Sequence, residues 1–335
     1  MQNKKPIVVV LGTGGTIAGV AASADDSVGY RVAQIGIAQL VGELPAFATV
    51  PIEVEQVAQI DSKDMGFTVW RALAHAVSRH LARAEVGACV IAHGTDTLEE
   101  TAYFLHRLLA PTKPVVLVAA MRPANSLQTD GPQNLLDAMV VAREPGAHGV
   151  VAVLAGKVHS ALDLRKVHAY RLDAFASGDA GVIGHVEQGR LRRHREWPGG
   201  AVIGDPCREW KGVARDLAGR LAQLPRDAAD WPVVEIVFSH VEARGLVVEA
   251  MCDAGVHGVV VAGTGNGSLH HTLESALIEA QSMGVAVLRC TRCGDGTATE
   301  KGGMLPAAEL PSAGALTPVQ ARVELILQLL ARRPA

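Results

Sequence analysis

The feature that most constrains the fold is an apolar run near the start of the chain that ends in a glycine-rich turn. Ile7–Val10 forms the run, and the segment Leu11–Gly19 follows it directly. A continuous apolar run of this kind predicts a strand buried on both faces, as in a parallel sheet covered by helices. Glycines after such a strand let the backbone bend sharply and approach a ligand, so we expect the hydroxyl of Thr16 to be accessible. From this segment alone, a structural turn without chemistry is an open alternative.

Short apolar runs alternate with helical periodicity through the first half of the chain. Strands are expected at 54–60, 88–92, 115–119 and 149–154, and helices at 35–44, 67–83, 99–109 and 133–142. Lys157–His168 is interpreted as a further strand with a basic, polar extension. Strands that alternate with helices predict an α/β fold with a doubly wound, mostly parallel sheet.

A change in composition divides the chain. Arg, Gly, Pro and Trp are frequent between Gly189 and Pro232, which favours a linker. A packed helix is predicted within it by the spacing of Trp210, Val213, Leu217, Leu221 and Leu224. Further strands and helices after the linker predict a smaller α/β domain. We therefore expect a larger N-terminal catalytic domain at 1–190, a linker at 191–231 and a C-terminal α/β domain at 232–335.

Composition limits the classes of function. The chain has 335 residues, is 49% hydrophobic and 19% charged, and carries a formal net charge of −3, which is typical of a globular protein with no attraction to phosphate backbones. We expect neither nucleic acid nor a membrane surface as a partner. Ile7–Leu11 is too short for a signal sequence or a spanning helix, so a cytoplasmic protein is expected.

Two familiar motif classes fit the sequence poorly. A dinucleotide fingerprint would need a third glycine where Ile17 stands. The five cysteines are an odd number, which favours free thiols, and Cys290 and Cys293 have no second ligand pair at zinc spacing. We expect no cofactor and no metal ion.

A second polar segment, His93–Thr101, follows the strand expected at 88–92. A hydroxyl nucleophile needs proton-handling groups nearby, and this segment is the best source of them. Taken singly, Thr95 and Asp96 could be only a helix cap and a first-turn acid, because both are common where a strand leads into a helix. Lys166 alone could be a surface lysine, and Tyr30 alone a core residue. His93 is interpreted as structural.

Together, Thr13–Gly19 and His93–Ala102 resemble the paired signatures of the bacterial-type L-asparaginases and glutaminase-asparaginases. Supporting matches span the chain, at Asp61-Ser62, Ala120–Pro123, Asp130–Leu135, Lys166, Gly263–Gly267, Arg289 and Arg292. The resemblance implies a larger N-terminal and a smaller C-terminal α/β domain. It also implies hydrolysis of a side-chain amide to a carboxylate and ammonia through a threonine acyl-enzyme.

Site residues follow from the same resemblance. It implies that Thr16 is the nucleophile, with Tyr30 against its hydroxyl, and that Thr95, Asp96 and Lys166 form a second triad. Ser62 and Asp96 would hold the α-carboxylate and α-amino groups, and the Ala120 carbonyl would meet the leaving nitrogen. The backbone N–H of Thr95 is a candidate oxyanion donor. The expected substrate-binding residues are Gly15, Asp61, Ser62, Lys63, Gly94 and Ala120.

The expected function is therefore that of an L-asparaginase for which L-glutamine is a poorer substrate. The alternatives are an amidase for a related small amide, a non-catalytic amino-acid-binding protein and the amide-hydrolysing subunit of an amidotransferase complex. We also expect a homo-oligomer, as a tetramer of tight dimers.

Three positions differ from the family pattern. Lys63 and Ser268 replace a glutamine and an asparagine, and near Gly303 there is no acid to reach a partner's site, Glu300 being the closest carboxylate. The Lys63 ammonium could face the substrate or solvent, and both alternatives are open.

Overall fold

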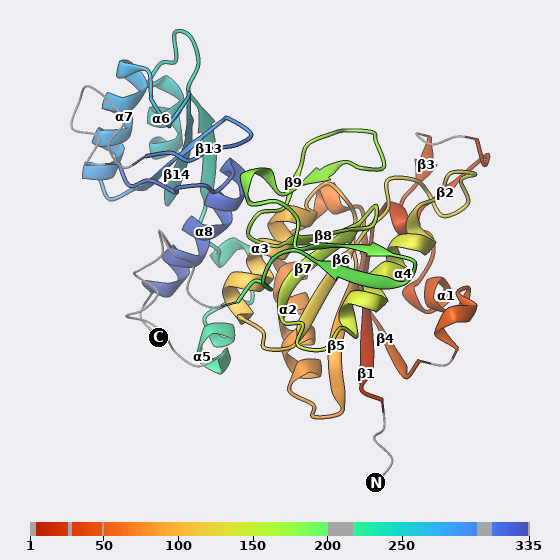
Figure 1. Ribbon diagram of the computed structural model, residues 1–335. Coiled ribbons are helices and arrows are strands. Elements are labelled where there is room, and N and C mark those ends of the chain that lie inside the picture. The colour runs from red at the N-terminus through yellow and green to blue at the C-terminus, as the bar shows by residue number, and fades with distance from the viewer. Residues whose placement is uncertain (1–4, 26–28, 49, 200–216, 300–309, 334–335) are drawn as a thin grey trace. The chain divides into compact units, whose positions relative to one another are not determined.

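The apolar runs of the first 200 residues form the strands of one large sheet (Figure 1). The computed structural model describes residues 5–25, 29–48, 50–199, 217–299 and 310–333, in two units that divide between residues 200 and 201. The parallel part of the sheet has the order β4 (Ile52–Ile60), β1 (Ile7–Gly14), β5 (Val86–Ala92), β6 (Pro114–Val118) and β7 (Gly149–Leu154). All residues of β6 and β7 are buried, as strands covered on both faces require.

Helices cover both faces of this sheet (Figure 1). On one face, α1 (Ile37–Gly42) and α4 (Gly131–Ala142) share a core with β1, β5, β6 and β7. On the other face, α2 (Phe67–Leu81) and α3 (Leu98–Leu109) pack together, and the rings of Trp70 and Phe104 stack with centroids 4.7 Å apart. The predicted doubly wound, mostly parallel sheet is thus confirmed.

The chain leaves β1 and β5 in opposite directions. β4 pairs with one edge of β1, whereas β6 pairs with the edge of β5 that faces away from β1. The carboxyl ends of β1 and β5 therefore form a topological switch point, where ligands bind in sheets of this class. The motif segment Thr13–Gly19 begins in the last two residues of β1, and the segment His93–Ala102 follows β5 directly.

Hairpins extend the sheet by three antiparallel strands that the sequence did not predict as such. They are β8 (Lys157–Ser160), β11 (Gly184–Glu187) and β12 (Arg190–Arg193). The two-residue turns before β8 and β12 have positive φ at Ala155 (48°), Gly156 (72°), Gln188 (50°) and Gly189 (71°), as tight hairpin turns require.

These hairpins correct two sequence expectations. The strand expected at Lys157–His168 divides into β8 and β9 (Arg165–Lys166), because the backbone turns after Ser160, and β9 pairs with β10 (Phe175–Ala176). The linker expected at 191–231 begins within β12, so its first residues belong to the large sheet. The limits 1–190, 191–231 and 232–335 otherwise stay a prediction.

The second unit has its own three-stranded parallel sheet. Its order is β13 (Val234–Phe238), β14 (Gly258–Gly263) and β15 (Ala286–Thr291). α6 (Leu246–Asp253) and α7 (His271–Ser282) share one core with the sheet, while α8 (Pro318–Ala331) contacts all three strands. Thr317 begins α8 with a reciprocal capping box to Gln320. The predicted smaller α/β domain is confirmed.

The remaining elements are short. α5 (Leu217–Ala222) is the described part of the predicted linker helix, while Trp210 and Val213 lie outside the described residues. Single 3-10 turns lie at η2 (Pro45–Phe47), η4 (Gly178–Ala180) and η6 (Ala228–Asp230). Within the described ranges, no helix has the length and apolar character needed to cross a membrane.

Candidate active site

Thr16 begins η1 (Thr16–Ala18), the tight turn that follows β1. The residue is 7% exposed, and its hydroxyl lies 2.8 Å from the hydroxyl of Tyr30. Tyr30 is carried by β3 (Tyr30–Arg31), which pairs with β2 (Val20–Ala21) immediately after the turn. The loop between these two strands includes residues 26–28, which lie outside the described ones. The structure thus brings Thr16 and Tyr30 together.

Two glycines allow the ends of β1 and β5 to meet. A Cβ on Gly15 would collide with the backbone of Gly94, and a Cβ on Gly94 would collide with the hydroxyl of Ser62. Gly15 also has a φ of +83°, a conformation that favours glycine. Gly15 and Gly94, both expected to bind substrate, therefore allow the two turns to approach closely, which brings Thr16 and Thr95 onto adjoining turns.

Lys166 joins the second group of predicted catalytic residues. From β9, its Nζ donates to Thr95 Oγ1 at 3.0 Å and to Asp96 Oδ1 at 2.7 Å. Thr95 is buried, whereas the Asp96 side chain is 51% exposed. An ammonium has donors only, so Thr95 Oγ1 accepts here and its own proton is free to point to another acceptor. The structure thus assembles Thr95, Asp96 and Lys166 as one hydrogen-bonded triad.

Ser62 connects the 61–64 turn to the start of α3. It begins η3 (Ser62–Asp64), is 2% exposed, and its Oγ accepts the backbone N–H of Asp96 at 3.1 Å. Thr97 donates its hydroxyl to the carbonyl of Ser62 at 2.7 Å. Asp61 caps the turn by accepting the N–H of Lys63 at 3.3 Å. These contacts fix Ser62 and Asp96 relative to each other.

Lys63 points to solvent. Its side chain is 62% exposed and its ammonium pairs with Asp64. The hydrogen bond to Asp64 raises the pKa of the lysine. Because Ser62 occupies the inward position of this short turn, the next side chain is turned out. The structure thus has the solvent-facing alternative for Lys63. The expectation that Lys63 is a substrate-binding residue is corrected.

The loop after β6 is fixed by the half-buried carboxylate of Asp130. Asp130 accepts the N–H of Met121 at 3.0 Å and the N–H of Arg122 at 3.0 Å, and Asn134 donates to it at 3.0 Å. Burial raises the pKa of Asp130 above its ordinary value, against the effect of these donors. Ala120, which precedes these two residues, is fully buried.

The five predicted catalytic residues share one cavity of about 220 Å³. Its lining residues are Thr16, Tyr30, Val32, Asp61, Thr95, Asp96, Met121, Arg122, Lys166, Ala169 and Tyr170. Among the other expected residues, Gly15 and Gly94 precede the two threonines in sequence, and Ser62 bonds to Asp96. Ala169 and Tyr170 were missed because they follow Lys166 in a segment without motif signal.

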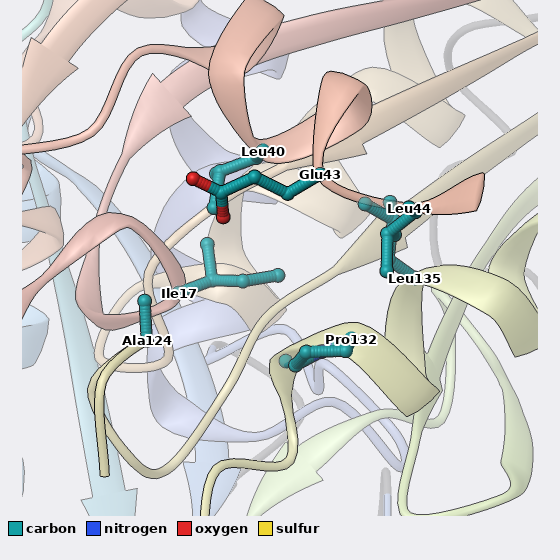
Figure 2. Close-up of a pocket in the computed structure, with 8 residues that line it drawn as sticks. Ile17, Leu40, Glu43, Leu44, Ala124, Pro132 and Leu135 are labelled. Atoms are coloured by element: carbon teal, nitrogen blue, oxygen red, sulfur yellow. The ribbon is translucent and has the colours of Figure 1, made fainter.

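A second cavity lies beside the Thr16 turn, with a volume of about 160 Å³ (Figure 2). It is lined by Ile17, Leu40, Glu43, Leu44, Ala124, Gly131, Pro132 and Leu135. Ile17 is 2% exposed and belongs to the core that α1 and α4 share with the sheet. Ile17, which stands where a dinucleotide fingerprint would need glycine, thus packs into the core and holds the turn that carries Thr16.

Two titratable groups flank the triad, the half-buried Glu99 and the fully buried His93. Burial raises the pKa of Glu99 to about 7, and its Oε2 accepts the N–H of Lys166 at 3.3 Å. Burial lowers the pKa of His93 to about 4, so this imidazole is neutral at neutral pH. His93 Nδ1 lies 2.7 Å from the carbonyl of Gly94, an acceptor, so Nδ1 carries the proton. This contact supports the interpretation of His93 as structural, which stays a prediction.

Comparisons with known proteins agree with this geometry. Residues 7–198 match the family model described as asparaginase, N-terminal, and residues 233–333 match the glutaminase/asparaginase C-terminal domain. The chain is 35% identical to L-asparaginase 2 of Escherichia coli, over 97% of this chain and 89% of that one. It is 33% identical to the glutaminase-asparaginase of Pseudomonas fluorescens, over 88% of this chain and 78% of that one.

A solved structure is similar over both units. The crystal structure of the probable cytoplasmic L-asparaginase from Campylobacter jejuni matches with a TM-score of 0.83 and 33% identity, covering 97% of this chain and 95% of that one. These findings confirm the resemblance that the two motif segments carry. The chain belongs to the asparaginase family.

Proposed function

We propose that this protein is an L-asparagine amidohydrolase, which converts L-asparagine to L-aspartate and ammonia and uses L-glutamine less well. The observation that carries the proposal is the convergence of two hydroxyl groups on one cavity. Thr16 pairs there with Tyr30, and Thr95 pairs there with Lys166 and Asp96. A binding protein needs no such paired hydroxyl and lysine groups.

In the first step, Thr16 Oγ1 attacks the side-chain amide carbon and forms a tetrahedral intermediate. Tyr30 orients the attacking hydroxyl through their 2.8 Å hydrogen bond and takes up its proton, while the phenol proton of Tyr30 passes into the cavity and replaces the one that Thr95 gives to the leaving nitrogen. The backbone N–H of Thr95 is assigned to the developing oxyanion. Collapse of the intermediate breaks the carbon–nitrogen bond, releases ammonia and leaves an aspartyl ester on Thr16, which water then hydrolyses.

The leaving nitrogen must gain a proton during this collapse. We assign that donation to Thr95. The oxygen of Thr95 accepts a hydrogen bond from Lys166, so the hydroxyl proton of Thr95 is free to be given to the nitrogen. The Lys166 ammonium lowers the cost of the negative charge that Thr95 then carries, and Asp96 holds the ammonium in place. The Ala120 carbonyl is assigned to the leaving nitrogen as acceptor.

The α groups of the substrate are assigned to the 61–62 turn and to Asp96. Ser62 Oγ accepts the N–H of Asp96, so its own proton is free to donate to the α-carboxylate. The half-exposed carboxylate of Asp96 is assigned to the α-ammonium. Gly15, Asp61 and Gly94 complete this side of the cavity by their position beside Thr16, Ser62 and Thr95.

We also propose a homo-oligomer, as a tetramer of tight dimers, and a cytoplasmic location. The free thiols of Cys89, Cys252, Cys290 and Cys293 favour a reducing compartment. The relatives differ on location, since the Campylobacter jejuni protein is described as a probable cytoplasmic enzyme and a Haemophilus influenzae relative as a probable periplasmic one. In the second unit, Ser268 donates to Asn266 at 3.2 Å, while Glu300 and Gly303 lie outside the described residues.

Ammonia release from L-asparagine, D-asparagine, L-glutamine and succinamic acid tests the proposal. The wild type should release ammonia fastest from L-asparagine, and Thr16→Ala should release almost none. Faster release from another amide would support the related-amidase alternative. Binding of L-asparagine without ammonia release would support an amino-acid-binding protein.

A further inference from the structure

Arg122 and Tyr170 form a stacked pair at the candidate active site. The guanidinium carbon of Arg122 lies 4.0 Å from the centroid of the Tyr170 ring. Nη1 of Arg122 donates to the carbonyl of Tyr170 at 2.9 Å and to the carbonyl of Met121 at 3.2 Å. An aromatic face attracts a guanidinium, and the rigid donor fork fixes the orientation. One arginine thus holds both the ring and the main chain of Tyr170.

Burial differs sharply between the two members of this pair. Arg122 is 5% exposed, and Asp130 fixes its backbone through the 3.0 Å hydrogen bond described above. Tyr170 is 52% exposed. A solvent-contacting ring is ordinarily free to change rotamer, but this ring rests on a buried, immobilised guanidinium. The pair therefore presents a fixed aromatic surface at the cavity.

Tyr170 lies on the turn that connects β9 to β10. Val167 and His168 donate their N–H groups to the carbonyl of Ala174 at 2.8 and 3.2 Å, which closes the base of the turn. His168 Nδ1 accepts the N–H groups of Tyr170 and Arg171 at 3.0 Å each, which shapes its tip. The turn follows Lys166 directly. Consequently the β9–β10 hairpin supplies both the catalytic lysine, from its first strand, and the aromatic ring, from its turn.

We propose that Tyr170, held by Arg122, is the wall that limits the length of the substrate side chain. The inference rests on the proposed function, because it concerns the choice between two amides in the same cavity of about 220 Å³. Thr16, Thr95 and Lys166 line the part of the cavity where the acyl transfer is proposed to take place. The Tyr170 ring has no chemical task there, so it bounds the remaining space.

L-Glutamine is one methylene longer than L-asparagine. With its α groups and its amide carbon both held, the extra methylene must be placed against a wall of the cavity. A fixed ring resists this displacement, so it selects the shorter amide. Tyr170 is then a specificity residue, and Arg122 is a positioning residue that acts through the ring.

Tyr170→Ala tests the wall, and Tyr170→Phe is its matched control, because it removes only the hydroxyl. The measured quantity is the ratio of kcat/KM for L-glutamine to kcat/KM for L-asparagine. The alanine variant should raise this ratio about tenfold or more, the effect of one methylene in a pocket, while the phenylalanine variant keeps it. The ring is half-exposed, so both variants should fold, and their melting temperatures check this.

Arg122→Met and Arg122→Lys test the support of the ring. The methionine variant should raise the ratio as Tyr170→Ala does, because the ring loses its base. The lysine variant keeps a cation over the ring and should restore part of the wild-type ratio. An unchanged ratio in a folded Tyr170→Ala protein overturns the proposal, as does a Tyr170→Phe ratio as high as that of the alanine variant.

Calorimetric binding of L-aspartate and L-glutamate separates this inference from the proposed function. If the wild type hydrolyses neither amide, the proposed function fails. The proposal that Tyr170 is a wall is then tested by the dissociation constants of L-aspartate and L-glutamate alone. The two constants should become similar in Tyr170→Ala and stay different in Tyr170→Phe. Constants that differ as much in the alanine variant as in the wild type refute the wall.

Discussion

Among single residues, Lys166 has the most consequential contacts, because its ammonium is bonded to both Thr95 and Asp96. Lys166→Ala should lower kcat by about a hundredfold to ten-thousandfold, the usual range for loss of proton-transfer machinery. Lys157→Ala is the matched control, since this lysine pairs instead with Asp173 at 2.8 Å. Its kcat should stay near that of the wild type.

The effects of Lys166→Ala and Thr16→Ala should not add, because both residues serve the same acyl transfer. Steady-state kinetics of the double variant measures this. A double variant far slower than either single one would mean that the two residues work in independent steps.

Glu99 gives the site a pH-dependent effect on stability. Burial raises its pKa to about 7 from 4.5, so above pH 4.5 the unfolded chain loses this proton while the folded chain keeps it until about pH 7. The stability that the neutral carboxyl contributes is therefore fully present below pH 4.5 and is lost as pH rises through 7. Glu99→Gln cannot titrate, so it escapes this loss.

Urea unfolding of the wild type and Glu99→Gln at several pH values measures the effect. The free energy of unfolding of the wild type, relative to the variant, should fall as pH rises through the window between the two pKa values, and should be constant at higher pH. A difference that is the same at every pH would contradict the raised pKa.

At the scale of elements, the contact between the turns after β1 and β5 is decisive. Gly94→Ala would place a Cβ against the Ser62 hydroxyl and 3.1 Å from the Cα of Gly15. This overpacking should cost about 1–3 kcal/mol of stability and lower kcat, because the two threonines move apart. Gly42→Ala, at the end of α1, meets nothing within 4 Å and is the control.

Thermal unfolding and kcat for these two variants check the contact. Gly42→Ala should be neutral or slightly more stable, since alanine favours a helix by up to about 1 kcal/mol. If Gly94→Ala keeps both wild-type stability and wild-type kcat, the turns do not depend on close backbone approach.

Sequence predicted the elements whose pattern is periodic and missed those that depend on a turn. Continuous apolar runs predicted β1, β5, β6 and β7, and apolar residues at helical spacing predicted α2 and α3. β11 and β12 carry mixed polar residues and depend on the Gln188–Gly189 turn, so β11 was not predicted and the composition of β12 instead indicated a linker. The break between β8 and β9 has no sequence signal, because both segments contain basic and apolar residues.

For the candidate site, sequence supplied the reactive side chains and the structure supplied their surroundings. Thr16 and Lys166 stand in recognisable segments, whereas Tyr170 follows no motif and reaches the cavity only because β9 and β10 form a hairpin. The direction of Lys63 could not be derived from the sequence, since it depends on which way a three-residue turn faces.

For the whole molecule, the assembly is a proposal that dilution can test. Sedimentation at micromolar and nanomolar protein, combined with activity at the same concentrations, should show a homo-oligomer whose activity falls as it dissociates. Such behaviour is expected when a partner subunit completes each site. A fully active monomer at micromolar concentration would contradict the proposed homo-oligomer.

The central claim is that Thr16 becomes acylated by the substrate. Mass spectrometry of protein quenched in acid during turnover of L-asparagine tests this most directly. The account predicts an increase by the mass of one aspartyl group, located by peptide mapping on Thr16 and absent from Thr16→Ala. An aspartyl group on Thr95, or undiminished turnover by Thr16→Ala, would contradict it.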